Sequence, residues 1–198
     1  MSATIRLATP DDAPGVLAIY EPVVVETATS FEEVAPTLEE MAKRIADTLE
    51  TYPWLICDCD GAVAGYAYAT RFRARAAYRW AVETSVYIHP DYQRVGVGRA
   101  LYRSLFALLA LQGYVTAYAG IAVPNYGSTG LHEAVGFEPI GVYWNVGYKL
   151  GAWRNVGWWG RELRELPARP EEPLPLAAAR ALAGWETALA AGAHELRI

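Results

Sequence analysis

Residues 93–99, QRVGVGR, stand between an apolar run that ends at Ile88 and a helical pattern that begins near Arg99. A glycine-rich turn from a strand into a helix exposes several backbone N–H groups at the positive end of the helix, and such groups bind phosphate. The spacing lacks the third glycine of the dinucleotide-binding pattern, and no Gly-Lys-Ser or Gly-Lys-Thr follows as in the ATP-binding loop. The stretch therefore predicts a phosphate site of another kind, with an ordinary tight turn as the alternative.

Composition narrows the class of protein. The chain has 198 residues, of which 53% are hydrophobic, and it carries a formal net charge of −5 at pH 7. A chain of this length can bury the core of one domain, and its negative charge with scattered basic residues argues against nucleic acid as a partner. No apolar run approaches about 18 residues, and the N-terminus lacks the basic and then apolar segments of a signal peptide. We therefore expect a cytoplasmic protein that does not bind a membrane.

The two cysteines, Cys57 and Cys59, lie two residues apart in one expected strand. Their side chains should share a face of that strand, where they are poorly placed to form a disulfide with each other. No histidine lies nearby to complete a zinc site. We expect both to be packing residues in a reducing compartment, and we expect no metal site.

The periodicity of apolar residues predicts an α/β fold with a mixed sheet. Strands are expected at residues 4–7, 54–59, 63–70, 81–88 and 115–122, with one more within 138–149. Helices are expected at residues 9–21, 37–49, 98–111 and 129–135. Thr37 begins the second helix with a capping-box pattern, Asp60-Gly61 favours a hairpin turn, and Gly136 ends the last helix.

The chain changes character after residue 163. Residues 1–163 form the predicted domain, whereas residues 164–198 indicate a proline-rich linker followed by an Ala-rich C-terminal helix. In that helix Leu182, Trp185 and Leu189 recur at helical spacing. We interpret the tail as a packing or dimer-contact element rather than a catalytic one.

Several short segments occur in the same order as in a known family. Pro124-Asn125 follows the strand after the glycine loop, and LHEAVGF stands at residues 131–137. This order resembles the Gcn5-related N-acetyltransferase superfamily. Further segments resemble its phosphinothricin and methionine sulfone/sulfoximine acetyltransferase branch, namely YPWL at 52–55, GYAYA at 65–69, RARAAYRW at 73–80, VETSVY at 82–87 and GAWRNV at 151–156.

The resemblance covers about residues 5–163 and implies both a fold and a reaction. The implied fold is a mixed, mostly antiparallel central sheet with two splayed parallel strands, flanked by helices, which is the acyl-CoA N-acyltransferase fold. The implied reaction uses acetyl-CoA as cosubstrate, a small amino acid as acceptor and no metal. Kinship also implies a homodimer.

The resemblance assigns three parts of the chain to the coenzyme. The glycine loop would hold the diphosphate with help from two arginines, the splayed strand would bind the pantetheine arm through its main chain, and the segment after the next strand would contact the same arm. The implied coenzyme-binding residues are Val86, Tyr87, Ile88, Arg94, Val95, Gly96, Val97, Gly98, Arg99, Asn125 and Ser128. As alternatives, Val86 and Ile88 can be core residues, and Pro-Asn is a common turn pair.

Glu83 interrupts an apolar strand, and the two-residue period places its side chain on one face with Ser85 and Tyr87. Apolar surroundings favour the neutral form of a carboxylate, which moves its pKa toward that of a working base. A solvent-facing carboxylate at a sheet edge is the alternative. In the resembled family a glutamate in this setting is the proposed base, so Glu83 is predicted to be catalytic.

His132 precedes the Gly-Phe corner at residues 136–137. Many acetyltransferases of the superfamily carry there a tyrosine that can protonate the departing thiolate, whereas the phosphinothricin branch has histidine. We predict a catalytic, supporting role for His132 near the acyl site. A helix histidine that only packs would explain the same sequence.

Arg73, Arg75 and Tyr78 are predicted to select the acceptor. If their segment is extended, both guanidinium groups lie on one side and can hold a carboxylate or phosphinate with two prongs. A solvated basic loop is the alternative. Ser85 joins this set by its place beside Glu83, and the resemblance adds two weaker candidates, Phe31 and Val156.

Three functions remain open. The leading one is direct attack of an α-amine on the thioester in a ternary complex, because neither cysteine lies in a segment assigned to the site. An acetyltransferase for a polyamine or a peptide N-terminus should line its acceptor side with acids, whereas this sequence offers two arginines. A non-catalytic acyl-CoA-binding module would keep the glycine loop but would have no use for Glu83.

Overall fold

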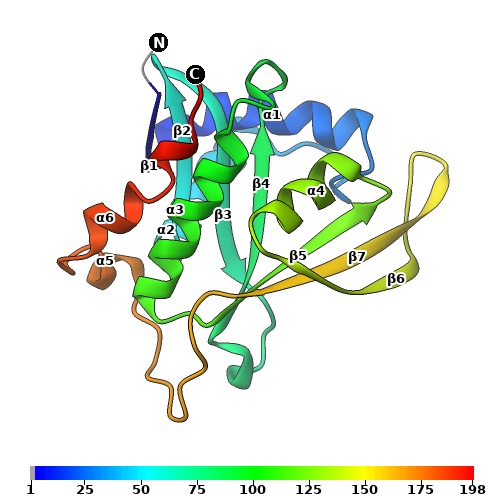
Figure 1. Cartoon of the computed structure of the whole chain (residues 1–198). Helices are drawn as coiled ribbons and strands as arrows, with labels where there is room; N and C mark the ends of the chain where they lie inside the picture. The colour runs from blue at the N-terminus through cyan, green and yellow to red at the C-terminus, as the bar shows by residue number, and fades with distance from the viewer. Residues whose placement is uncertain (1–2) are drawn as a thin grey trace.

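The computed structural model describes residues 3–198 and is built on a seven-stranded sheet in the order β1-β2-β3-β4-β5-β7-β6 (Figure 1). The strands are β1 (Ala3–Leu7), β2 (Trp54–Cys59), β3 (Ala62–Arg71), β4 (Ala81–Ile88), β5 (Thr116–Val123), β6 (Glu138–Lys149) and β7 (Ala152–Glu162). All neighbouring strands are antiparallel except β4 and β5, which are parallel. The prediction of a mixed, mostly antiparallel sheet is confirmed.

Helices cover both faces of this sheet. The helices are α1 (Ala13–Glu26), α2 (Leu38–Leu49), α3 (Val97–Gln112), α4 (Tyr126–Ala134), α5 (Leu176–Ala179) and α6 (Trp185–Leu189), with single 3-10 turns at Pro10–Asp12, Ala76–Tyr78, Pro90–Tyr92 and Ala193–Glu195. Strand β2 explains the two layers, because Leu55 and Cys57 join the core under α3 while Trp54 and Ile56 join the core under α1 and α2. Burial on both faces makes the central strands almost continuously apolar.

Two helix boundaries show how local signals and packing compete. The capping box predicted for α2 is present, since the Thr37 side chain accepts a hydrogen bond from the Glu40 backbone N–H at 3.2 Å and the Glu40 carboxylate accepts one from the Thr37 N–H at 2.7 Å. Helix α1, however, continues through Pro22 to Glu26 rather than ending near residue 21. Val24 is completely buried in this last stretch, so core packing extends the helix past the missing proline N–H.

Strands β4 and β5 diverge, which is visible where their ribbons separate in Figure 1. Only residues 81–83 of β4 pair with residues 116–118 of β5. Beyond this point β4 keeps its pairing with β3, and β5 keeps its pairing with β7. The splayed pair implied by the resemblance is therefore present, and it leaves the main chain of residues 84–88 without a partner strand on the β5 side.

The end of the sheet differs from the sequence prediction. One last strand was expected within residues 138–149, but the chain makes a hairpin of β6 and β7, with β7 inserted between β5 and β6. No strand was predicted at residues 152–162, where glycines 157 and 160 occur within β7. In the structure a Cβ at Gly160 would lie 2.8 Å from Cδ1 of Ile140 and 3.2 Å from the Tyr118 ring, so the side chains of two neighbouring strands pack against this glycine.

The C-terminal tail also differs from its prediction. Instead of one Ala-rich helix, residues 176–195 form two short helices and a 3-10 turn that pack along α3 of the same chain. Leu176 and Trp185 are buried in the core under α3. The Ser104 hydroxyl of α3 donates to the Leu189 carbonyl at 2.6 Å and accepts from the Gly192 N–H at 3.1 Å. The tail is therefore an integral part of the fold.

Within residues 3–198, no helix combines the length and the apolar character that a membrane crossing requires.

Candidate coenzyme and acceptor site

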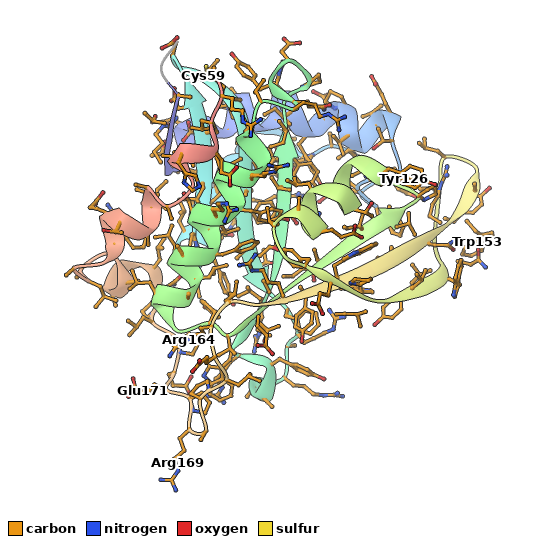
Figure 2. The ribbon with its side chains drawn as sticks, viewed as in Figure 1. Cys59, Tyr126, Trp153, Arg164, Arg169 and Glu171 are labelled. Atoms are coloured by element: carbon orange, nitrogen blue, oxygen red, sulfur yellow. The ribbon has the colours of Figure 1, made fainter. Side chains whose placement is uncertain are left out.

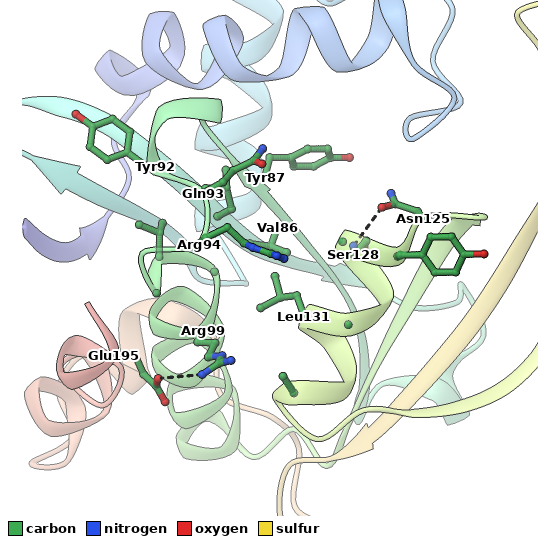
Figure 3. Close-up of a pocket in the computed structure, with 18 of the residues that line it drawn as sticks. Val86, Tyr87, Tyr92, Gln93, Arg94, Arg99, Asn125, Ser128, Leu131 and Glu195 are labelled. Atoms are coloured by element: carbon green, nitrogen blue, oxygen red, sulfur yellow. Dashed lines mark hydrogen bonds and ion pairs between the residues drawn. The ribbon is translucent and has the colours of Figure 1, made fainter. Parts of the chain in front are cut away.

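A cavity of about 690 Å³ lies beside the split between β4 and β5, at the N-terminal ends of α3 and α4 (Figure 3). Ten of the eleven predicted coenzyme-binding residues line it, namely Val86, Tyr87, Ile88, Arg94, Gly96, Val97, Gly98, Arg99, Asn125 and Ser128. The eleventh, Val95, belongs to the same loop and accepts a hydrogen bond through its carbonyl from the Arg197 N–H at 3.0 Å. The structure thus brings the predicted set together.

The glycine loop has the backbone shape of a phosphate-binding turn. Gly96 is the N-cap of α3 and has a φ of 93°, in the left-handed region that glycine tolerates best. Arg94 also has a positive φ, 67°, so the chain turns sharply just before the helix. The first N–H groups of α3 have no acceptor within the helix and lie at its positive end. This arrangement can bind a diphosphate.

Helices α3 and α4 approach each other closely at the cavity. A Cβ at Gly98 would lie 2.7 Å from Cδ2 of Leu131, so a larger residue there would require the Leu131 side chain to move. Asn125 fixes the start of α4, since its side-chain oxygen accepts a hydrogen bond from the Ser128 N–H at 3.1 Å (Figure 3). Asn125 therefore positions the helix whatever it contacts in a ligand.

Glu83 is the last β4 residue to pair with β5 and lies at the start of the split. The register with β3 is continuous, so Glu83, Ser85 and Tyr87 share the face opposite to the buried Val82 and Thr84, as the alternation predicted. Burial raises the pKa of the Glu83 carboxyl, and the positive charge of Arg73 opposes that shift. A half-buried carboxylate with a raised pKa can act as a general base.

The predicted acceptor residues come from four separate segments. Arg73 stacks over the ring of Phe72 at 4.3 Å and lies 5.2 Å from that of Trp158. Tyr78 packs edge-on against Phe72 with 5.9 Å between ring centroids. Ser85 is opposite Tyr68 on β3, Val156 is opposite Ala122 on β5, and the Phe31 ring lies against the backbone at Gly147 of β6.

The condition for a two-pronged clamp by Arg73 and Arg75 is not met. The segment between β3 and the 3-10 turn at Ala76–Tyr78 is a bend rather than an extended strand. Arg73 folds back onto aromatic rings, whereas Arg75 precedes the 3-10 turn and is exposed. The expected extended conformation is therefore absent, and within the bend Arg71 donates to the carbonyls of Arg73 and Ala74.

His132, like Glu83 and the predicted acceptor residues, is not among the residues that line this cavity, and it is only 3% exposed. Its Nδ1 donates to the Ser128 carbonyl at 2.7 Å, because a carbonyl can only accept, and its Nε2 therefore accepts from the Tyr102 hydroxyl at 2.8 Å. Burial lowers the pKa of His132, which keeps the ring neutral, and the hydrogen bond to Ser128 opposes this shift. Tyr102 in turn contacts Thr84, whose hydroxyl donates to the Tyr118 carbonyl at 3.3 Å.

This chain of contacts links α4, α3, β4 and β5 just where the two strands part. The geometry matches the packing alternative for His132 and gives the residue a defined structural task. A proton donor facing a departing thiolate would need at least one ring nitrogen directed into the cavity.

Several cavity residues were not predicted from the sequence. They are Thr29, Tyr92, Gln93, Tyr126, Gly127, Gly130, Leu131, Ala134, Glu195 and Arg197. Most of them are sequence neighbours of predicted residues. The helical period of α4 could also have pointed to Leu131, which lies about one turn after Gly127 and Ser128. Glu195 and Arg197 carry no local signal, because only the folding of the tail brings them to the loop.

The described part of the chain shows neither a cluster of metal ligands nor a reactive thiol. Residues 3–198 contain no group of three or more histidine, cysteine or acidic residues that could hold a metal ion. Both cysteines are buried and free, as expected for packing residues, and burial raises the pKa of Cys57 to about 11. A thiol of this kind is a poor nucleophile.

Comparisons with known proteins agree with this fold. Residues 5–158 match the family model described as an acetyltransferase (GNAT) domain. The chain is 38% identical over 172 residues to a phosphinothricin N-acetyltransferase of Streptomyces viridochromogenes, covering 87% of this chain and 93% of that protein. It is 39% identical over 161 residues to an L-methionine sulfoximine/L-methionine sulfone acetyltransferase of Pseudomonas aeruginosa, covering 79% and 92%.

A solved structure shares the fold. It is a GNAT superfamily phosphinothricin acetyltransferase from Sinorhizobium meliloti in complex with acetyl-CoA, with a TM-score of 0.82 and 36% sequence identity, covering 88% of this chain and 96% of that one.

Proposed function

This chain belongs to the GNAT acetyltransferase family, in its phosphinothricin and methionine sulfoximine N-acetyltransferase branch, and from that premise we propose its acceptor and mechanism. We propose that it moves the acetyl group of acetyl-CoA to the α-amine of a small amino acid such as phosphinothricin, methionine sulfoximine or methionine sulfone. The observation that carries the proposal is Glu83, a half-buried carboxylate with a raised pKa at the split, with Arg73 near it.

The residues of the cavity suit the coenzyme. The N–H groups at the start of α3 would hold the diphosphate, with Arg94 and Arg99 adding positive charge. The unpaired β4 edge at residues 84–88 would offer hydrogen bonds to the amides of the pantetheine arm. Acetyl-CoA itself supplies an activated acetyl group as a thioester.

Glu83 accepts the proton that the α-ammonium group must lose, directly or through a water molecule. The free amine attacks the thioester carbonyl carbon, the C–N bond forms, the C–S bond breaks, and the sulfur leaves as coenzyme A thiolate. No acyl-enzyme is needed in this scheme. The buried cysteines offer no alternative nucleophile beside the cavity.

His132 has a positioning role in this proposal rather than a catalytic one. Its hydrogen bond with the Tyr102 hydroxyl joins α4 to α3, its bond to the Ser128 carbonyl fixes the ring within α4, and the contact of Tyr102 with Thr84 extends the link to β4. The width of the split would then depend on His132 although the ring does not reach the substrate.

Arg73 is the proposed acceptor-binding cation. Its planar guanidinium group can bind a carboxylate or an oxygen-rich side chain, and its stacking on Phe72 restricts its orientation. Tyr78, Ser85, Phe31 and Val156 would form the surrounding walls, with Arg75 at the exposed rim.

A panel of amino acids assayed with acetyl-CoA tests the acceptor, with release of free thiol as the readout. We expect turnover with phosphinothricin, methionine sulfoximine or methionine sulfone well above the rate without acceptor. Polyamines and a peptide with a free N-terminus serve as the competing acceptors. Faster turnover of either competitor than of every amino acid in the panel would refute the proposed acceptor class.

The β6–β7 hairpin offers a surface for a second copy of the chain. Large apolar side chains are exposed along it, with Trp144 72% and Trp153 64% exposed, and Trp153 stands at the edge of the molecule in Figure 2. A patch of this kind marks an interaction surface. The Phe31 ring already packs against this hairpin, so a dimer formed here would adjoin the acceptor pocket. We expect a dimer by light scattering for the wild type and a monomer for Trp144→Lys, and a monomeric wild type would contradict the dimer.

A further inference from the structure

The last residues of the chain lie against the glycine loop. A Cβ at Gly96 would overlap the carbonyl oxygen of Glu195, and a Cβ at Gly192 would overlap the carbonyl oxygen of Ala100. The Arg197 N–H donates to the Val95 carbonyl at 3.0 Å. The backbone of the tail thus contacts the backbone of the glycine loop and of the first turn of α3. The end of the tail therefore has a defined position beside the predicted diphosphate site.

Glu195 uses its carboxylate to organise the basic side chains of α3. It accepts a hydrogen bond from Nε of Arg103 and lies 4.0 Å from Nη1 of Arg99, as Figure 3 shows for the second pair. The hydrogen bond from Arg103 holds the pKa of Glu195 below its ordinary value. The Glu195 side chain is only 12% exposed, so this carboxylate is part of the cavity wall rather than a solvated charge.

Arg197, unlike Glu195, has a side chain without a partner in the described chain. It lines the same cavity, it is exposed, and its side chain makes no hydrogen bond or ion pair with any residue of the described chain, 3–198. Because its backbone is fixed at Val95, its guanidinium group is tethered within reach of the loop. Coenzyme A carries a diphosphate and a further phosphate on its ribose, and an arginine that is held in place binds such groups well.

We propose that the C-terminal segment completes the coenzyme site, with Arg197 binding a phosphate group of coenzyme A and Glu195 holding Arg99 beside the loop. This inference rests on the proposed function, since it takes acetyl-CoA as the cosubstrate. The matched family domain ends at residue 158, so Arg197 lies outside it. The tail is thereby assigned to ligand binding as well as to packing.

Calorimetric titration of the purified full chain with coenzyme A tests the assignment. We expect Arg197→Ala to bind coenzyme A about tenfold more weakly than the wild type, as for the loss of an exposed charge-assisted contact. Arg197→Lys should recover part of that loss. The matched control is Arg169→Ala, an exposed arginine of the same tail that points away from the body of the molecule in Figure 2. Thermal melting of each variant checks that the fold is intact.

Dephospho-coenzyme A identifies the phosphate involved. If Arg197→Ala weakens coenzyme A but not dephospho-coenzyme A, Arg197 binds the ribose phosphate; if both are weakened equally, it binds the diphosphate. Coenzyme A affinity of Arg197→Ala equal to that of the wild type and of Arg169→Ala would overturn the proposal. Because binding is read without turnover, a failure of the amino-acid panel would contradict the proposed acceptors and leave this result standing.

Discussion

The proposed coenzyme side and the proposed acceptor side of the split are built in different ways. On the coenzyme side one contiguous loop, residues 93–99, supplies a backbone cradle, and the β4 edge adds further main-chain groups. On the acceptor side, the proposed side chains come from the loop between α1 and α2, the segment after β3, and strands β4 and β7.

The difference separates two kinds of recognition. A main-chain cradle binds a phosphate whatever the neighbouring side chains are, provided that the backbone can adopt the required shape. A pocket made of dispersed side chains depends on every element that positions them, so small changes in the hairpin or in the bend after β3 can change the acceptor. Mutations should therefore change the rate of the chemical step, the affinity for coenzyme A and the KM for the acceptor separately.

The largest effect is expected from Glu83→Gln. Loss of the general base should lower kcat/KM about 10²- to 10⁴-fold while coenzyme A still binds, because the carboxylate lies outside the phosphate cradle. In the wild type the acid limb of the kcat/KM profile should lie above about pH 4.3, the ordinary pKa of glutamate, since burial raises the pKa of Glu83. Activity should fall as the pH drops through this limb.

The exposed Glu138→Gln on β6 is the control for Glu83→Gln. Activity of Glu83→Gln equal to that of this control at neutral and alkaline pH would remove Glu83 from the mechanism.

The second-largest effect is expected from Gly96→Ala, which tests the backbone shape of the glycine loop. The added methyl group meets both a positive φ and the Glu195 carbonyl, so we expect a loss of stability of about 2–3 kcal/mol together with weakened coenzyme A binding. Gly61→Ala is a matched control, because Gly61 has a φ of 89° but nothing lies near its added Cβ. Chemical denaturation and coenzyme titration of both variants give the comparison. Equal losses in the two variants would mean that contact with the tail adds nothing to backbone strain.

The third effect concerns His132, whose hydrogen bond with Tyr102 joins α4 to α3. His132→Ala leaves the Ser128 carbonyl and the Tyr102 hydroxyl without their partner, and we expect a loss of about 1–2 kcal/mol in the free energy of unfolding. Because burial lowers the pKa of His132, the folded chain binds fewer protons than the unfolded chain below about pH 6.5, so stability should fall as the pH drops.

That acid loss should be smaller in His132→Ala than in the wild type. Denaturation curves between pH 5 and pH 8 provide the measurement, and an identical pH dependence in the wild type and His132→Ala would contradict the packing role.

The smallest effect is expected on the acceptor side. Arg73→Ala should raise KM for the amino acid about tenfold and leave coenzyme A affinity unchanged. The positive charge of Arg73 holds down the pKa of Glu83, so the acid limb should also move to higher pH in this variant. Arg164→Ala, an exposed arginine after β7, is the control. An unchanged KM together with an unchanged acid limb would exclude Arg73 from the pocket.

Local patterns predicted those parts of the site whose geometry is set by neighbouring residues. The glycine loop, the alternation that places Glu83 beside Ser85, and the cap of α2 each depend on a few consecutive positions. The failures have two different causes. Strand β7 contains Gly160, whose bare backbone packs against the remote side chains of Ile140 and Tyr118, whereas the segment of Arg73 and Arg75 forms a local bend in which Arg71 donates to the carbonyls of Arg73 and Ala74.

The sequence by itself determined the glycine turn proposed to bind phosphate, since the positive φ of Gly96 and the exposed N–H groups follow from a glycine directly before a helix. Only the tertiary structure decided that Arg197 reaches this turn and that His132 faces Tyr102 rather than the cavity. These contacts join segments that are remote along the chain, and they are fixed by how the whole core packs, which no short window of residues records.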